Sequence, residues 1–156
     1  NDYLSVYKTG DVIGTEICGA IKNIMAIGSG IINGMGYPES SSAMFITLAT
    51  KEIAHLIKCL EGDVNTIFSF AGIGDLILTC SSKESRNFTL GNMIGKKIDT
   101  KDYIKNTTIE GLYTLRAITN IVKNNNIDMP IIMMIDDIIN SKKSTDDFIK
   151  LLIKLK

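Results

Sequence analysis

The sequence predicts an all-α domain preceded by a short strand. Apolar residues recur at three- and four-residue steps over most of the chain, and Ser, Asp or Pro precedes several of these runs, as at helix starts. Only residues 3–7 alternate apolar and polar side chains as a strand does. A chain of 156 residues that is 45% hydrophobic suits one domain with a sizeable core. We therefore expect about seven helices within residues 11–156.

The predicted strand, residues 3–7, belongs to a leading segment of residues 1–10 that ends in a turn. A lone strand is not stable, so we expect it to complete a sheet that lies mostly outside this chain. The sequence begins with Asn and has no basic-then-apolar signal segment. We expect the chain to be part of a longer protein.

The stretch over residues 10–30 is the predicted central helix. Ile17, Ile24 and Ile31 recur at helical steps, and Asp11 can cap the first turn. Lys22 lies one turn from small residues, which leaves space in front of its ammonium group. Spacing alone favours a solvated lysine on an amphipathic helix. Four of the five glycines in this stretch lie inside the predicted helix, where each costs about 1 kcal/mol, so close packing or a nearby ligand must favour them.

The remaining helices are justified by caps and apolar stripes. Serines can cap a second helix, Asp63 a short third one, Pro130 suits a first helical turn, and Ser144 with Asp147 resembles a capping box. His55 lies among charged residues off the apolar stripe and is expected at the surface. The predicted ranges are 42–61, 63–68, a short helix from 75, 85–95, a turn at 102–105, 111–123, 130–139 and 144–155.

Asp75 is the first candidate outside the central helix. Two glycines lie within the three residues before it, which indicates a tight backbone and a carboxylate held at a helix start. A simple N-cap explains the same pattern at least as well.

A candidate anion site follows at the start of the next helix. Ser85, Arg86 and Asn87 would lie in its first turn, where free amides and the helix dipole attract anions, and Arg86 adds a bidentate donor for phosphate. An ordinary serine-capped helix with a surface arginine is the alternative.

Composition excludes several functions. The 17 basic and 17 acidic residues cancel, which gives no support for a nucleic-acid or anionic-membrane partner. The longest uncharged run, residues 23–38, is shorter than the roughly 20 residues of a membrane span. Three scattered cysteines and a single histidine make a poor zinc set, so we expect no metal site and a reducing, cytoplasmic setting.

Four stretches together resemble one enzyme family. They are D-V-I-G-x-E-x-x-G-A-x-K-N at residues 11–23, A-G-x-G-D-L-x-x-T-C at 71–80, S-R-N at 85–87 and E-G at 110–111. In this order they resemble the C-terminal half of bacterial-type NAD(P)-dependent glycerol-3-phosphate dehydrogenases. The resemblance implies a helical domain of the 6-phosphogluconate dehydrogenase C-terminal-like type.

The resemblance also implies an activity. Members of the family transfer hydride reversibly between sn-glycerol 3-phosphate and dihydroxyacetone phosphate, and supply glycerol 3-phosphate for phospholipid synthesis. They bind NAD(P) mainly on an N-terminal Rossmann domain, whose G-x-G-x-x-G fingerprint this chain lacks. The strand at residues 3–7 would then be the last strand of that domain, and the chain alone would be inactive. Its partners would be a phosphorylated triose and the Rossmann domain, and a homodimer stays open.

Site roles follow from the resemblance by motif. Lys22 matches the catalytic lysine, which would exchange a proton with the substrate oxygen as hydride moves. Asp75 matches the carboxylate that orients this lysine and binds a substrate hydroxyl. Thr108 departs from the family's usual Val. The implied substrate contacts are Lys22, Asn23, Asp75, Thr79, Ser85, Arg86 and Asn87, and the implied cofactor contacts are Arg86, Thr108 and Glu110.

Two alternatives remain from the sequence. Another β-hydroxyacid dehydrogenase would share a helix with a Lys and an Asn, although the Gly-rich turn at Asp75 and the Ser-Arg-Asn turn suit a phosphorylated triose better. A non-catalytic helical dimerisation module is the alternative of another class. Upstream sequence would discriminate, because a Rossmann fingerprint there supports an enzyme.

Overall fold

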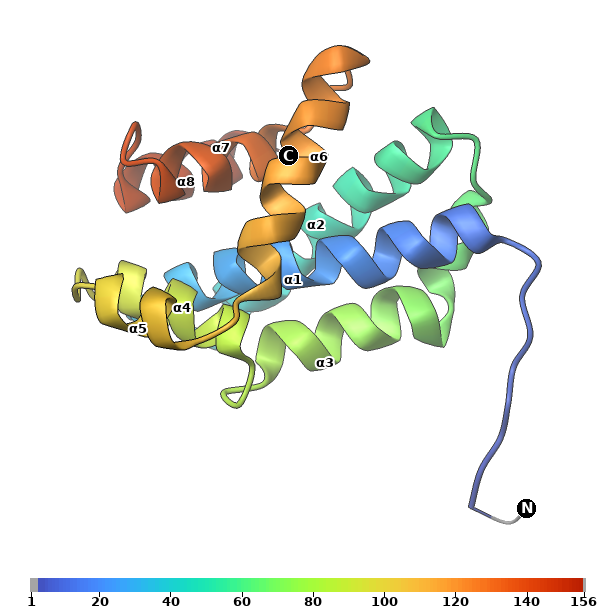
Figure 1. Ribbon diagram of the computed structural model, residues 1–156, viewed down its shortest axis with the longest axis horizontal. Helices are drawn as coiled ribbons and strands as arrows, with labels where there is room; N and C mark the ends of the chain where they lie inside the picture. The colour runs from blue at the N-terminus through green and yellow to red at the C-terminus, as the bar shows by residue number, and fades with distance from the viewer. Residues whose placement is uncertain (1–2, 156) are drawn as a thin grey trace.

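A single long helix, α1 (Val12–Gly34), runs through the middle of the molecule, and the other elements surround it (Figure 1). The computed structural model describes residues 3–155, which contain eight α-helices and no strand. The other elements are α2 (Glu39–Cys59), the 3-10 turn η1 (Val64–Phe68), the π-helical turn η2 (Phe70–Gly74), α3 (Asp75–Ser81), α4 (Arg86–Gly95), α5 (Lys101–Asn106), α6 (Glu110–Asn124), α7 (Pro130–Ile139) and α8 (Thr145–Lys154). The all-α prediction is confirmed.

The core is organised around α1. The Asp11 carboxylate accepts a hydrogen bond from the Gly14 amide at 3.0 Å, which confirms the predicted cap. Every residue from Asn23 to Ile32 is buried. The helix is long and apolar enough to cross a membrane by length and composition, but two-thirds of its most apolar window is buried in the fold. Within the described residues it is therefore a core helix of the fold.

Glycines bring α1 and α4 into backbone contact. A Cβ at Gly30 would overlap the backbone of α4, and a Cβ at Gly91 would overlap the backbone of α1. Gly34 and Gly95 complete the contact in the same way. This close packing answers why α1 tolerates glycines that weaken a helix. The helix ends at Gly34, four residues past its predicted end at residue 30.

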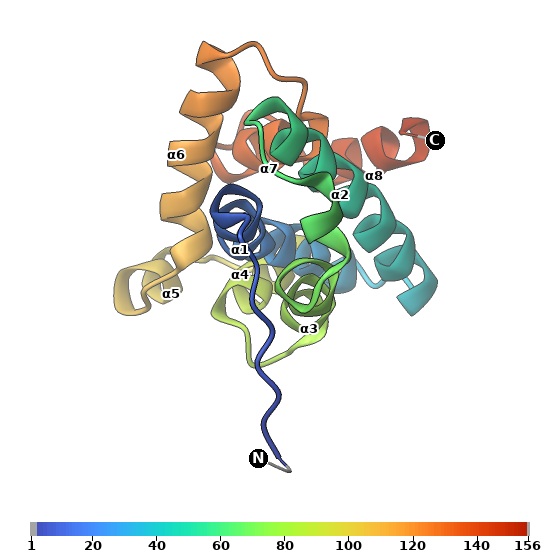
Figure 2. The ribbon, with the colours of Figure 1, turned by 90° about the vertical axis from the view of Figure 1, so that its right-hand side faces the viewer.

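The leading segment departs from the prediction. Residues 4–9 extend away from the helices without strand pairing (Figure 2), so the predicted strand at residues 3–7 is absent from the described chain. The physical reason is that a strand requires a neighbour for its backbone hydrogen bonds. The Tyr7 ring contacts Phe70 of η2, with centroids 5.2 Å apart. The assignment of this segment to a preceding domain stays a prediction.

The start of α2 also differs from the prediction. The helix begins at Glu39 after Pro38, so the serines at 40–42 lie in its first turn and do not cap it. Most other helix starts agree with the predicted caps: the Asp63 carboxylate accepts from the Asn65 amide, and Ser144 forms a capping box with Asp147.

Glu52 of α2 is buried, although acidic side chains are seldom buried without partners. Both carboxylate oxygens accept backbone amides at the start of α7, from Ile131 and Ile132, each at 2.9 Å. Burial raises the pKa of Glu52 to about 7, despite these hydrogen bonds, and the negative charge of Asp128 adds to the rise. Glu52 therefore caps a helix that has no side-chain cap of its own.

Candidate active site

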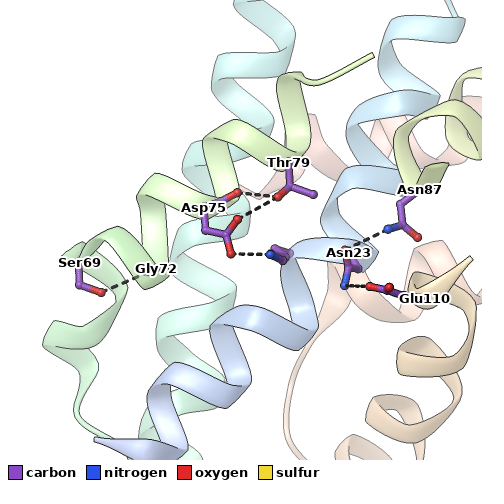
Figure 3. Close-up of polar contacts among 8 residues, drawn as sticks. Asn23, Ser69, Gly72, Asp75, Thr79, Asn87 and Glu110 are labelled. Carbon is purple, nitrogen blue, oxygen red and sulfur yellow. Dashed lines mark hydrogen bonds and ion pairs between the residues drawn. The ribbon is translucent and has the colours of Figure 1, made fainter. Parts of the chain in front are cut away.

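The ammonium group of Lys22 on α1 lies 2.5 Å from the Asp75 carboxylate at the start of α3. Both side chains are partly accessible, with 26% and 31% of their surface exposed. Figure 3 shows the Asp75 carboxylate reaching toward α1. Asp75 is the first residue of α3, whose N-cap is Gly74, so the N-cap alternative is wrong. The Asp75 carboxylate instead accepts a charge-assisted hydrogen bond from the ammonium group of Lys22.

An irregular backbone before α3 places Asp75 at the start of that helix. At Gly72 the backbone leaves helical geometry, with φ −93° and ψ −106°, and a Cβ there would overlap the backbone of Ile67. The Ser69 hydroxyl accepts from the Gly72 amide at 3.3 Å. One turn later the Thr79 hydroxyl donates to the Asp75 carbonyl at 2.7 Å and lies 3.3 Å from the carboxylate. The predicted tight backbone is therefore confirmed at Gly72.

Asn23 begins a second cluster, which joins α1, α4 and α6. Its amide nitrogen donates to Glu110 at 3.3 Å, and its amide oxygen accepts from Asn87 at 3.0 Å. The Asn87 oxygen in turn accepts from the Gly111 backbone amide at 2.9 Å. Asn23 and Asn87 are both buried, so their amides hold the three helices together at this point.

Arg86 and Glu110 form the accessible rim of this second cluster. Their charged groups lie 3.7 Å apart, and more than half of each side chain is exposed. Arg86 is the first residue of α4, and the Ser85 hydroxyl before it accepts from the Phe88 amide at 3.3 Å. The Tyr103 hydroxyl donates to the Arg86 carbonyl at 3.4 Å. Such an exposed pair can open to bind an anion at little cost, since exposed ion pairs contribute about 0–1 kcal/mol.

The predicted site residues thus fall into two neighbouring groups. One consists of Lys22, Asp75 and Thr79, and the other is built around Asn23. Ser85 is positioned with the second group as the cap of α4, whereas Thr108 is exposed before α6 and joins neither group through the contacts described. Because Lys22 and Asn23 are consecutive on α1, the two groups lie side by side.

Other reactive side chains do not extend this site. Burial raises the pKa of Cys18 to about 11 and of Cys80 to about 12, so both thiols stay protonated and are poor nucleophiles. Within residues 3–155 no three His, Cys, Asp or Glu side chains gather as metal ligands. The Gly111 amide and the Tyr103 hydroxyl were not predicted from the sequence. The E-G pair at residues 110–111 was the only signal for Gly111.

Comparison with known proteins places the chain among dehydrogenases. The family model described as NAD-dependent glycerol-3-phosphate dehydrogenase C-terminus matches residues 11–150. Glycerol-3-phosphate dehydrogenase (NAD(P)+) of Staphylococcus saprophyticus is 40% identical over 152 residues, which cover 96% of this chain and 46% of the relative. That of Staphylococcus aureus strain USA300 is 44% identical over 133 residues, which cover 84% and 40%. The chain therefore spans about half the length of these relatives.

Solved structures agree. Glycerol-3-phosphate dehydrogenase from Coxiella burnetii is 33% identical, with a TM-score of 0.90 over 95% of this chain and 46% of that one. The yeast enzyme is 24% identical, with a TM-score of 0.82 over 91% and 42%, and supports the fold alone. The matched region contains both clusters around α1. The chain belongs to the family of NAD-dependent glycerol-3-phosphate dehydrogenase C-terminal domains.

Proposed function

We propose that the chain is the substrate-binding and catalytic half of an NAD(P)-dependent glycerol-3-phosphate dehydrogenase. The reaction is reversible hydride transfer between dihydroxyacetone phosphate and sn-glycerol 3-phosphate. The observation that carries the proposal is the Lys22–Asp75 pair, an ammonium group held by a carboxylate and still partly open to solvent. Its neighbour is an exposed arginine at a helix start.

Lys22 acts on the substrate oxygen. Reduction of a carbonyl builds negative charge on its oxygen, and a nearby ammonium group stabilises that charge and donates a proton to it. In the reverse direction the neutral amine takes the proton of the alcohol. Asp75 keeps the lysine aimed at the substrate and accepts a hydrogen bond from a substrate hydroxyl. Thr79 supports Asp75 through its two contacts with that residue.

Arg86 binds the phosphate group. It opens from Glu110 and offers two parallel N–H donors, while the start of α4 adds backbone amides. Ser85 contributes by capping this helix. Asn23 and Asn87 hold α4 and α6 against α1, so they fix the separation between the phosphate site and Lys22.

The cofactor supplies hydride when it is bound. This chain offers cofactor contacts only beside the start of α6. Arg86 and Glu110 are charged and accessible there, and Thr108 is exposed just before that helix. We place the main NAD(P) site on an N-terminal Rossmann domain that packs near the leading segment. Phe68 and Phe70 are more than two-thirds exposed there and offer it an apolar surface. We also propose that the enzyme is cytoplasmic and supplies glycerol 3-phosphate for phospholipid synthesis.

The test uses the two-domain protein, meaning this chain joined to the N-terminal domain that we propose. Oxidation of NADH or NADPH is followed after dihydroxyacetone phosphate is added. Lys22→Ala should lower turnover by about 10²–10⁴-fold, the range for loss of a general acid, with an unchanged circular dichroism spectrum. Lys51→Ala, an exposed lysine on α2, should keep wild-type turnover.

Full turnover in Lys22→Ala would refute the catalytic role, and an unfolded variant would make Lys22 structural. A folded wild-type protein that reduces other β-hydroxy acid precursors but not dihydroxyacetone phosphate would move the enzyme to a neighbouring class. The chain alone should show no turnover.

A further inference from the structure

Gly19 differs from the other glycines of α1. At Gly14, Gly28, Gly30 and Gly34 a Cβ would collide with a neighbouring group, which explains why no side chain stands there. Among residues 3–155, a Cβ at Gly19 would meet nothing within 4 Å beyond its chain neighbours and the backbone of its own helix. Its backbone is ordinary helix, which alanine adopts at lower cost by about 1 kcal/mol. Neither packing nor backbone conformation explains this glycine.

The open space at Gly19 lies between the two polar clusters. A helix turns by about 100° per residue, so Gly19 is about 60° around α1 from Lys22 and about 40° from Asn23, within the sector that separates them. Lys22 points to Asp75, and Asn23 points to Glu110 on the other side. Helical side chains lean toward the N-terminus, which brings the side chain of Lys22 toward the level of Gly19.

We propose that Gly19 is a size-determining residue of the substrate pocket, whose missing side chain leaves room for the three-carbon chain of the substrate. The inference rests on the proposed function. A small phosphorylated ketone must reach Lys22 with its carbonyl and Arg86 with its phosphate, so its carbon chain has to cross the sector between them. Any side chain at residue 19 would project into that path.

The test is a size series at residue 19 in the two-domain protein. Gly19→Ala and Gly19→Leu both favour helix, so they separate bulk from helix propensity. Gly19→Ala should raise the melting temperature yet increase KM for dihydroxyacetone phosphate by about tenfold, and Gly19→Leu by about 100-fold or more, in the range that a misfitting methyl or larger group produces. KM for the nicotinamide cofactor should stay within about twofold of wild type.

The matched control is Asn120→Ala, an exposed position of α6 that also gains helix propensity. It should raise the melting temperature without changing either KM. Wild-type KM for the triose in both Gly19 variants would overturn the inference, as would a change in cofactor KM alone or a loss of stability in Gly19→Ala. Absence of turnover in the wild-type protein would instead refute the proposed function, and the inference with it.

Discussion

Two carboxylates of this domain, Asp75 and Glu52, have opposite surroundings. Asp75 stands at the rim of α3 with 31% of its side chain exposed, and its partner is the ammonium group of Lys22. Glu52 is 7% exposed in the middle of α2, and its partners are two backbone amides of α7. An accessible carboxylate with a partly exposed cationic partner can share that partner with a substrate. A buried carboxylate with both oxygens committed can only hold the fold.

A substitution of Asp75 tests the contrast between the two carboxylates most directly. Asp75→Asn keeps the size of the side chain and removes its charge, so Lys22 loses its counter-ion. We expect kcat of the two-domain protein to fall by about 10²-fold or more. Urea denaturation should show a change in the free energy of unfolding of about 1 kcal/mol, because a partly accessible ion pair contributes little to stability.

Asp137→Asn is the control, because Asp137 also faces a lysine, Lys142, at 3.9 Å. It should leave kcat unchanged. A large loss of stability in Asp75→Asn, with kcat preserved, would make Asp75 a second structural carboxylate and remove the contrast.

Glu52 should give the reverse pattern. Glu52→Ala leaves two buried amides without acceptors, so the free energy of unfolding should drop by about 1–3 kcal/mol. Turnover per folded molecule of the two-domain protein should not change. Urea denaturation of the chain measures the first quantity, with Glu39→Ala, an exposed acid in the first turn of α2, as the milder control. Equal losses in both variants would show that the α7 cap contributes nothing.

The last expected effect is a pH dependence of stability. The pKa of Glu52 is raised from 4.5 to about 7 in the fold, so the folded protein holds a proton that the unfolded chain releases. Its contribution to stability is complete below pH 4.5 and is lost as the pH rises through about 7, by at most about 1.4 kcal/mol per pH unit. Glu52→Gln should flatten this slope.

Two other acids act in the opposite direction. The pKa of Asp11 is lowered by the Thr66 hydroxyl, and the pKa of Asp147 by Ser144, so their stabilisation is lost only as the pH falls from about 4. The difference between wild type and Glu52→Gln cancels their contribution. Identical slopes in the two proteins would show that Glu52 does not titrate in this window.

The contrast also explains what the sequence could reveal. Local signals predicted the caps at Asp11 and Ser144 and most helices, because a cap and its amides lie within a few residues. Resemblance, and not spacing, singled out Lys22 and Asp75, since each alone has an ordinary explanation. Glu52 escaped prediction because its partners lie 79 and 80 residues away. An apolar helix start with no acceptor of its own was the available hint.

The strand prediction at residues 3–7 was wrong for a related reason. Alternation describes how a segment would sit in a sheet, whereas pairing depends on chain that is far away or outside. The glycines of α1 were recognised as unusual, but only the helix crossing distinguishes those that touch α4 from Gly19, which faces open space.

The backbone contact between α1 and α4 has a consequence for redesign. At Gly30 and Gly91 the backbones of the two helices are in direct contact. Neither helix can therefore shift or rotate against the other when a residue nearby is changed. A library of substitutions at the proposed substrate site would therefore leave the arrangement of these two helices unchanged. A change in substrate selectivity in such a library would then result from the new side chain and not from a shift of α1 against α4. The glycines at the helix crossing must be kept unchanged for this to hold.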